Sequence, residues 1–224
     1  MYDHNTVMES ASVKKDTRGE LLAAAFRLLE AEGPQALQAR RVTAEIGAST
    51  MAVYTHFGGM PGLIDAVVRE GLTRFADHVR EGAPETDDPM ADLIAGGLEY
   101  GGFALGNPQL YRLMFGLGGG PQVRSLPDAE RTLEMAEGGE ALSVLLDSVE
   151  RVIAAGLIPE QDPRGAATQI LSVTHGYLLL RIGGFVEEEL RDVMPSLAVN
   201  LMVGLGADRE LTERSLARAI EARS

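Results

Sequence analysis

Five side chains that could contact DNA stand close together near the first quarter of the chain. They offer hydroxyls, an imidazole and a thioether, groups that suit phosphates and base edges, and they are Thr50, Met51, Tyr54, Thr55 and His56. Arg40 and Arg41 precede them and add two guanidiniums. These groups can act together only if they share one exposed face, so neighbouring elements must provide that face.

Residues 39–57 predict two short helices joined by a tight turn. Gly47 can adopt the positive φ that such a turn requires, and a hydroxyl of Ser49 or Thr50 can cap the second helix. The alternative is a short helical hairpin inside an ordinary bundle. Each predicted helix has two apolar residues four apart, which share one face: Val42 with Ile46, and Val53 with Phe57.

Two longer helices flank this pair. One is predicted from Asp16 or Thr17 to about Glu32, where Gly33-Pro34 ends it, and the other from about Pro61 to Val79. We therefore expect a flexible tail over residues 1–16 and a helix-turn-helix DNA-binding domain over residues 17–60. Lys14 and Lys15, in the tail, are further candidates for phosphate contacts.

Residues 61–224 contain helix-length segments and nothing that alternates like a strand. The fold class is therefore predicted to be all-α: a three-helix DNA-binding domain followed by a helical bundle, to which the candidate effector-binding and dimerisation residues given below belong. The predicted helices of the bundle are 89–106, 108–116, 128–156, 163–184, 192–206 and 208–222.

The charge is unevenly distributed along the chain. The formal net charge is −13, but residues through Met60 contribute only −1 and the remainder contributes −12. The acidic part is expected to stay off DNA, and phosphate binding by the nearly neutral first part should be modest and sensitive to salt. No signal-peptide core or long apolar run occurs, so we expect a cytoplasmic protein that is not a membrane partner.

Aromatic and methionine side chains cluster around two predicted helices of the second part. Such residues could line an apolar cavity, although a packed core is the commoner meaning of the same spacing. His175, beside Thr174 on an apolar segment, could contact an effector or be a neutral core residue. The candidate effector-binding residues are Tyr100, Phe103, Tyr111, Met114, Phe115, Thr174 and His175.

Two segments, 170–185 and 197–205, are apolar nearly all round. Helices without a polar face need burial on both sides, and a two-fold four-helix interface between two copies would supply it. A simply buried central helix is the alternative. A two-fold dimer would present its recognition helices about 34 Å apart, or a multiple, which predicts a palindromic operator.

An enzyme is disfavoured by the inventory of reactive residues. The chain has no Cys, its four His are scattered, and no pair has metal-ligand spacing. No nucleophile motif or phosphate-binding loop occurs. We therefore expect no catalytic residues, no metal and no cofactor.

The segment from Thr17 to about Phe75 resembles the N-terminal domain of TetR-family transcriptional regulators. The resemblance lies in residues 45–63, EIGASTMAVYTHFGGMPGL, which contain the family's Tyr-x-His-Phe pattern at Tyr54 to Phe57. Farther on, residues 107–115 and Thr174-His175-Gly176 resemble the subset with a Trp-x-x-x-His-Gly-type C-terminal domain, although this chain has no Trp.

The resemblance implies a homodimeric repressor that a small molecule releases from double-stranded DNA. It implies phosphate contacts for Tyr54 and His56, and base-edge contacts for Arg40, Thr50 and Met51. Three positions depart from the family pattern: Gln38 replaces a capping Thr, Thr55 a longer side chain, and Met60 a Lys. The alternative function is a small-molecule-binding protein that has lost DNA binding and acts through a protein partner.

Overall fold

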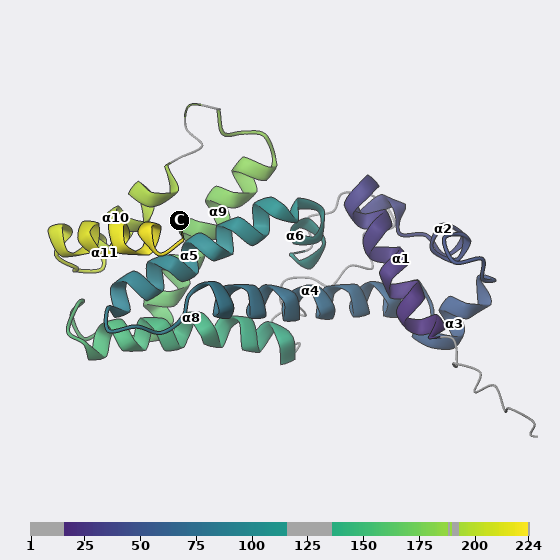
Figure 1. Ribbon diagram of the computed structural model, residues 1–224, viewed down its shortest axis with the longest axis horizontal. Helices are drawn as coiled ribbons and strands as arrows, with labels where there is room; N and C mark the ends of the chain where they lie inside the picture. The colour runs from purple at the N-terminus through teal and green to yellow at the C-terminus, as the bar shows by residue number, and fades with distance from the viewer. Residues whose placement is uncertain (1–15, 116–135, 188, 190–192, 224) are drawn as a thin grey trace, which may run out of the picture.

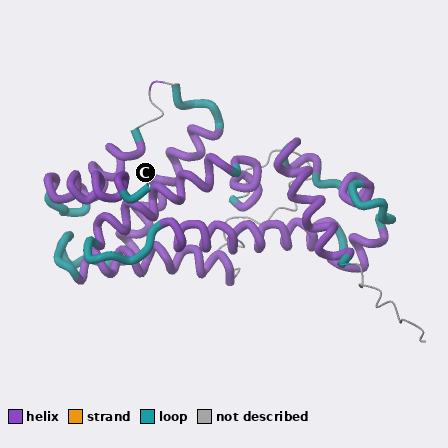
Figure 2. Tube along the Cα trace, viewed as in Figure 1, coloured by secondary structure: helices purple, strands orange, loops and turns teal. Residues whose placement is uncertain are grey.

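Figure 1 shows a computed structural model that describes residues 16–115, 136–187, 189 and 193–223. Within these ranges the regular structure is helical and no strand occurs (Figure 2), which confirms the predicted all-α fold. One end of the elongated molecule contains α1 (Thr17–Glu32), the short 3-10 turn η1 (Pro34–Ala36), α2 (Ala39–Ala44) and α3 (Met51–Phe57). The long helix α4 (Met60–Gly82) leads from this end into a helical bundle (Figure 1).

The bundle follows the predicted helices closely. It contains α5 (Pro89–Gly106), α6 (Pro108–Met114), α8 (Ala136–Ala154), α9 (Pro163–Ile182), α10 (Met194–Gly204) and α11 (Arg209–Glu221). Each bound lies within a few residues of its prediction, except that the expected start of α8 at residues 128–135 lies outside the described residues. None of the helices in the described ranges is both long and apolar enough to cross a membrane.

Aspartate caps explain where four of these helices begin. A cap carboxylate accepts a hydrogen bond from a backbone N–H that has no partner within the helix, which stabilises the helix by about 1 kcal/mol. Asp16 accepts from Gly19 N at 3.0 Å, as predicted, and Asp88 accepts from Ala91 N at 3.0 Å. Asp162 and Asp208 cap α9 and α11 in the same way.

The turn between α2 and α3 forms at Gly47, whose φ of +66° is in the region that only glycine adopts readily. The predicted hydroxyl cap of α3 is wrong: α3 has no side-chain cap, because Thr50 is itself in the α-helical region rather than the extended conformation that a capping side chain needs. Gly62 explains how closely α4 packs on α3. A Cβ at Gly62 would lie 1.9 Å from the carbonyl oxygen of Phe57, so a larger residue would push the two helices apart.

The core beneath α3 continues into the bundle. Phe26 and Val53 belong to one buried cluster with Leu63 and Phe75 of α4 and Met114 of α6. The predicted boundary at residue 60 thus lies at the start of a helix that serves both parts of the molecule. The division into residues 17–60 and 61–224 stays a prediction.

The helices predicted to lie at a dimer interface are incompletely covered in the single chain. In α9 only Ala166, Ala167, Tyr177 and Leu178 are buried, and Leu180 is 53% exposed. In α10 only Val199 and Met202 are buried. These exposures disagree with the alternative of a simply buried central helix.

Candidate functional site

The candidate DNA-contacting residues of α3 share an exposed surface, called here the α3 face: Thr50, Met51, Tyr54, Thr55 and His56. Met51 is 65% exposed and Tyr54 is 59% exposed, whereas Val53 between them is buried in the core. The Thr55 hydroxyl donates to the Met51 carbonyl oxygen at 2.9 Å. The helix thus buries one side and presents the predicted contact groups on the other.

The two arginines of α2 differ in their surroundings. Arg40 is exposed, whereas Arg41 donates two hydrogen bonds to Glu32 at the end of α1, one of them at 2.9 Å. These hydrogen bonds raise the pKa of Arg41 and lower the pKa of the Glu32 carboxyl. To contact a phosphate, Arg41 would have to leave Glu32 or bridge both groups.

The other cationic candidates, and two further positions near the α3 face, are placed as follows. Lys14 and Lys15 lie outside the described residues. Arg18, beside them, holds its guanidinium 5.0 Å from the centre of the Phe57 ring, which fixes α1 against the end of α3. Met60, where the family pattern has Lys, packs against the buried core instead.

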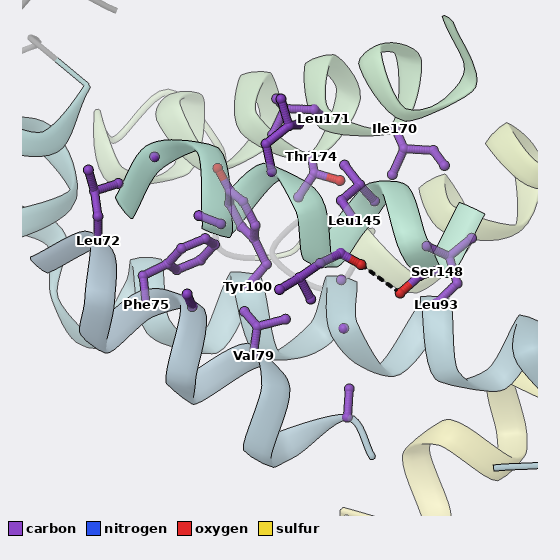
Figure 3. Close-up of a pocket in the computed structure, with 18 of the residues that line it drawn as sticks. Leu72, Phe75, Val79, Leu93, Tyr100, Leu145, Ser148, Ile170, Leu171 and Thr174 are labelled. Atoms are coloured by element: carbon purple, nitrogen blue, oxygen red, sulfur yellow. Dashed lines mark hydrogen bonds between the residues drawn. The ribbon is translucent and has the colours of Figure 1, made fainter. Parts of the chain in front are cut away.

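An apolar cavity of about 120 Å³ lies inside the bundle between α4, α5, α8 and α9 (Figure 3). Leu72, Phe75 and Val79 of α4 form one wall, and Leu171 of α9 lies across from them (Figure 3). The Tyr100 side chain stands between these walls. The cavity has the character of a site for a small apolar molecule with few polar contacts.

The polar groups on the cavity wall are few. Asp92 is buried, but its carboxylate already accepts from Thr86 N at 2.8 Å, from the Thr86 hydroxyl at 2.6 Å and from Arg151 at 2.9 Å. The Ser148 hydroxyl donates to the Val144 carbonyl oxygen at 2.9 Å (Figure 3). Tyr100 and Thr174 supply the other hydroxyls of the wall.

Tyr100, Tyr111 and His175 form a triangle of polar atoms beside the cavity, called here the Tyr-Tyr-His cluster. The two hydroxyls are 2.9 Å apart, and His175 Nδ1 lies 2.6 Å from the Tyr111 oxygen and 3.2 Å from the Tyr100 oxygen. Burial raises the pKa of Tyr100 to about 12, raises that of Tyr111 further, and lowers the pKa of His175. All three groups are therefore neutral at pH 7.

The structure separates the predicted effector-binding residues into three groups. Tyr100, Phe115 and Thr174 line the cavity. Tyr111 and His175 lie behind Tyr100 and contact it through hydrogen bonds.

Phe103 and Met114 belong instead to the buried core that runs along α4. Phe103 packs edge-on against Phe75, with ring centres 5.3 Å apart. Glu99, next to Tyr100, pairs with His78 at 3.0 Å and Arg223 at 2.7 Å.

Sequence reasoning missed the walls that α4 and α8 contribute. In the sequence, Leu72 and Val79 indicate only the apolar side of a helix, and the apolar spacing of Ala141, Leu142 and Leu145 has the same ambiguity. Across the described ranges, no three His, Asp or Glu side chains converge where they could hold a metal ion.

Comparison with known proteins decides which family this architecture represents. Residues 21–67 match the family model for bacterial regulatory proteins of the tetR family, and residues 93–202 match the model for the tetracyclin repressor-like C-terminal domain. The chain belongs to the TetR family. Within that family the α3 face lies in the matched N-terminal domain, and most of the cavity wall lies in the matched C-terminal domain.

The individual proteins to which this chain is similar are distant in sequence. The nucleoid occlusion factor SlmA of Pectobacterium carotovorum subsp. carotovorum (strain PC1) is 30% identical over 112 residues, which are 48% of this chain and only 55% of that relative. A protein of unknown function from Rhodococcus sp. RHA1 is 26% identical, with a TM-score of 0.72 over 88% of this chain and 99% of that one. FadR of Bacillus subtilis, solved with stearoyl-CoA, is 16% identical, with a TM-score of 0.67 over 84% and 98% of the two chains; at that identity it shares the fold alone.

The neutral His175 predicts a specific pH dependence of stability. Because the folded pKa lies below the unfolded value, the unfolded chain binds the proton first as the pH falls below about 6.5. The free energy of unfolding of the wild type should therefore fall, relative to His175→Gln, from about pH 6.5 down to the folded pKa. Urea unfolding between pH 7.5 and 5, at one protein concentration, measures this difference. If the free energies of unfolding of the two proteins change with pH in parallel, the prediction is contradicted.

Proposed function

We propose that this TetR-family protein is a homodimeric transcriptional regulator that binds a palindromic operator. In this proposal it acts as a repressor and leaves the operator when a small, mainly apolar molecule enters the cavity. Such a regulator would act in the cytoplasm, where a bacterium keeps its DNA.

The observation that carries the proposal is that one helix, α4, packs under the α3 face and also lines the cavity. The first half of α4 packs under α3 through Leu63 and Val67, and its second half lines the cavity through Leu72, Phe75 and Val79. A molecule that moves α4 at the cavity would also move the α3 face. In a dimer this would change the distance between the two faces, which must match the operator half-sites.

Dimerisation is supported by the uncovered apolar surfaces of α9 and α10. Val173 and Leu179 of α9 remain partly exposed, as do Leu197 and Leu201 of α10. A two-fold arrangement would pair these two helices with the same helices of a second copy.

The second candidate function, a ligand-binding protein that no longer binds DNA, rests on the charges around the α3 face. Arg41 is held by Glu32, Met60 packs against the core, and the net charge of the chain is −13. Each of these features lowers the attraction for phosphates.

The two candidates predict opposite results in a DNA-binding experiment. DNA should be selected from a random pool, and its binding measured by fluorescence anisotropy over a range of salt concentrations. The repressor proposal predicts tight binding to a palindrome, with log K falling linearly with log salt. Weak, sequence-independent binding even at low salt would overturn it in favour of the second candidate.

A further inference from the structure

We infer that the cavity selects a neutral, mainly apolar molecule with a hydrogen-bond donor, such as a hydroxyl, that donates to the Tyr100 oxygen. This inference rests on the proposed role of the cavity as an effector site. It follows from where the hydrogen atoms of the Tyr-Tyr-His cluster must lie and from the charges on the cavity wall.

We place the hydrogen of the 2.6 Å contact between the Tyr111 oxygen and His175 Nδ1 on the Tyr111 oxygen. This contact is shorter than the ordinary range for an N–H···O hydrogen bond, about 2.7–3.2 Å, and fits a hydroxyl that donates to a ring nitrogen. Nδ1 is therefore the acceptor, and the neutral ring carries its proton on Nε2. Because His175 is only partly buried, that N–H can meet solvent.

The Tyr100 hydroxyl then has its own hydrogen directed into the cluster. The Tyr111 oxygen at 2.9 Å accepts it, because the one lone pair of Nδ1, 3.2 Å away, already accepts from the Tyr111 hydroxyl. Tyr111 is completely buried, whereas Tyr100 keeps some exposure and lines the cavity. What Tyr100 offers to a molecule in the cavity is consequently a lone pair.

A ligand that donates a hydrogen bond and one that accepts it therefore differ in the bonds they gain. A donor adds a hydrogen bond to Tyr100 and leaves the cluster unchanged. An acceptor must draw the Tyr100 hydrogen away from the cluster, so it exchanges one hydrogen bond for another. The cavity should accordingly favour the donor over an otherwise similar acceptor.

Charge on the cavity wall disfavours ions. Among the described residues that line the cavity there is no Lys, Arg or His, and the one charged group is the Asp92 carboxylate. An anion would lose its hydration beside that carboxylate and gain no cation. A cation would compete with Arg151, which already holds Asp92. The occupant is therefore neutral.

Fluorine NMR titrations with small ring compounds test the inference on the full-length protein at pH 7. The probes are 4-fluorophenol, 4-fluorotoluene, 4-fluoroacetophenone and 4-fluorobenzoate. Tyr100→Phe should weaken the binding of 4-fluorophenol by about 3- to 10-fold, which is the effect of one neutral hydrogen bond. It should change the affinity for 4-fluorotoluene by less than about twofold. Tyr177→Phe, the same change at a buried position that does not line the cavity, should alter neither. The benzoate should not bind.

The possible results separate this inference from the proposed function. If 4-fluorotoluene binds but Tyr100→Phe leaves 4-fluorophenol binding unchanged, the inference fails and the apolar effector site stands. If Tyr100→Phe weakens the ketone rather than the phenol, the hydrogen positions are reversed and the inference fails again. If neither the phenol nor the toluene binds, the cavity is not an effector site for small apolar molecules and both proposals fail. Long-range ¹H–¹⁵N correlation of the His175 ring provides a second check, because a proton on Nδ1 would contradict the inference.

Discussion

Replacing Tyr54 by alanine should weaken operator binding by at least about 100-fold. Tyr54 is 59% exposed on the α3 face, next to the buried Val53 that anchors the helix. A hydrogen bond to a charged phosphate contributes about 1.5–3 kcal/mol, and a two-fold dimer contains the contact twice, so about 3–6 kcal/mol is at stake. Fluorescence anisotropy with the selected operator, at fixed salt, measures the loss.

Two controls test whether the loss comes from a missing DNA contact. Because Tyr54 is exposed, its truncation should change the free energy of unfolding by no more than about 0.5 kcal/mol. Tyr54→Phe keeps the ring and removes the hydroxyl, so it separates the hydrogen bond from ring packing. If Tyr54→Ala binds the operator as tightly as the wild type does, α3 is not the recognition helix.

The helices around α3 could be predicted because their signals are local. The turn at Gly47 and the cap at Asp16 each depend on residues within a few positions of one another. The pairing of Val42 with Ile46 on one helical face was wrong, because α2 ends at Ala44 and Ile46 lies in the turn that follows. The missing cap of α3 shows where such reasoning fails: a hydroxyl at the right position caps only if its backbone is extended, and Thr50 is helical.

The pairing of Arg41 with Glu32 could not be predicted in the same way, because the end of α1 approaches α2 only in the folded chain. From its position in the sequence, Arg41 is an exposed basic residue beside a recognition helix. Whether such a residue is free to contact DNA depends on a carboxylate nine positions earlier that no helical periodicity relates to it.

The cavity was the least predictable part of the molecule. Tyr100, Tyr111 and His175 were each plausible candidates, but residues 11 and 75 positions apart form one hydrogen-bonded cluster only after α5, α6 and α9 pack together. Phe103 and Met114 are residues of the same apolar kind and lie on the same helices as Tyr100 and Tyr111, yet they pack along α4 in the core. Apolar periodicity identifies a buried face without distinguishing a filled interior from a hollow one.

Replacing Gly97 by leucine should reduce effector binding by at least about 100-fold and leave operator binding intact. Gly97 lines the cavity, and a Cβ at this position would meet no atom within 4 Å, so a leucine side chain can occupy the space that a ligand needs. Leucine also favours the helix by up to about 1 kcal/mol over glycine, so the thermal midpoint should stay or rise. Calorimetric titration with an effector found by screening, together with operator binding in its presence and absence, measures both effects.

The matched control is Gly106→Leu, the same change on the same helix at an exposed position outside the cavity wall, where a Cβ also meets no atom within 4 Å. It should retain both effector binding and release from DNA. If the leucine only fills the cavity, the protein remains on its operator in the presence of effector, because the effector can no longer displace the part of α4 that lines the cavity. Normal effector binding and release in Gly97→Leu would place the effector elsewhere. Loss of operator binding without effector would instead show that the leucine disturbs α4 itself, and would contradict the prediction that the cavity can be filled independently of the α3 face.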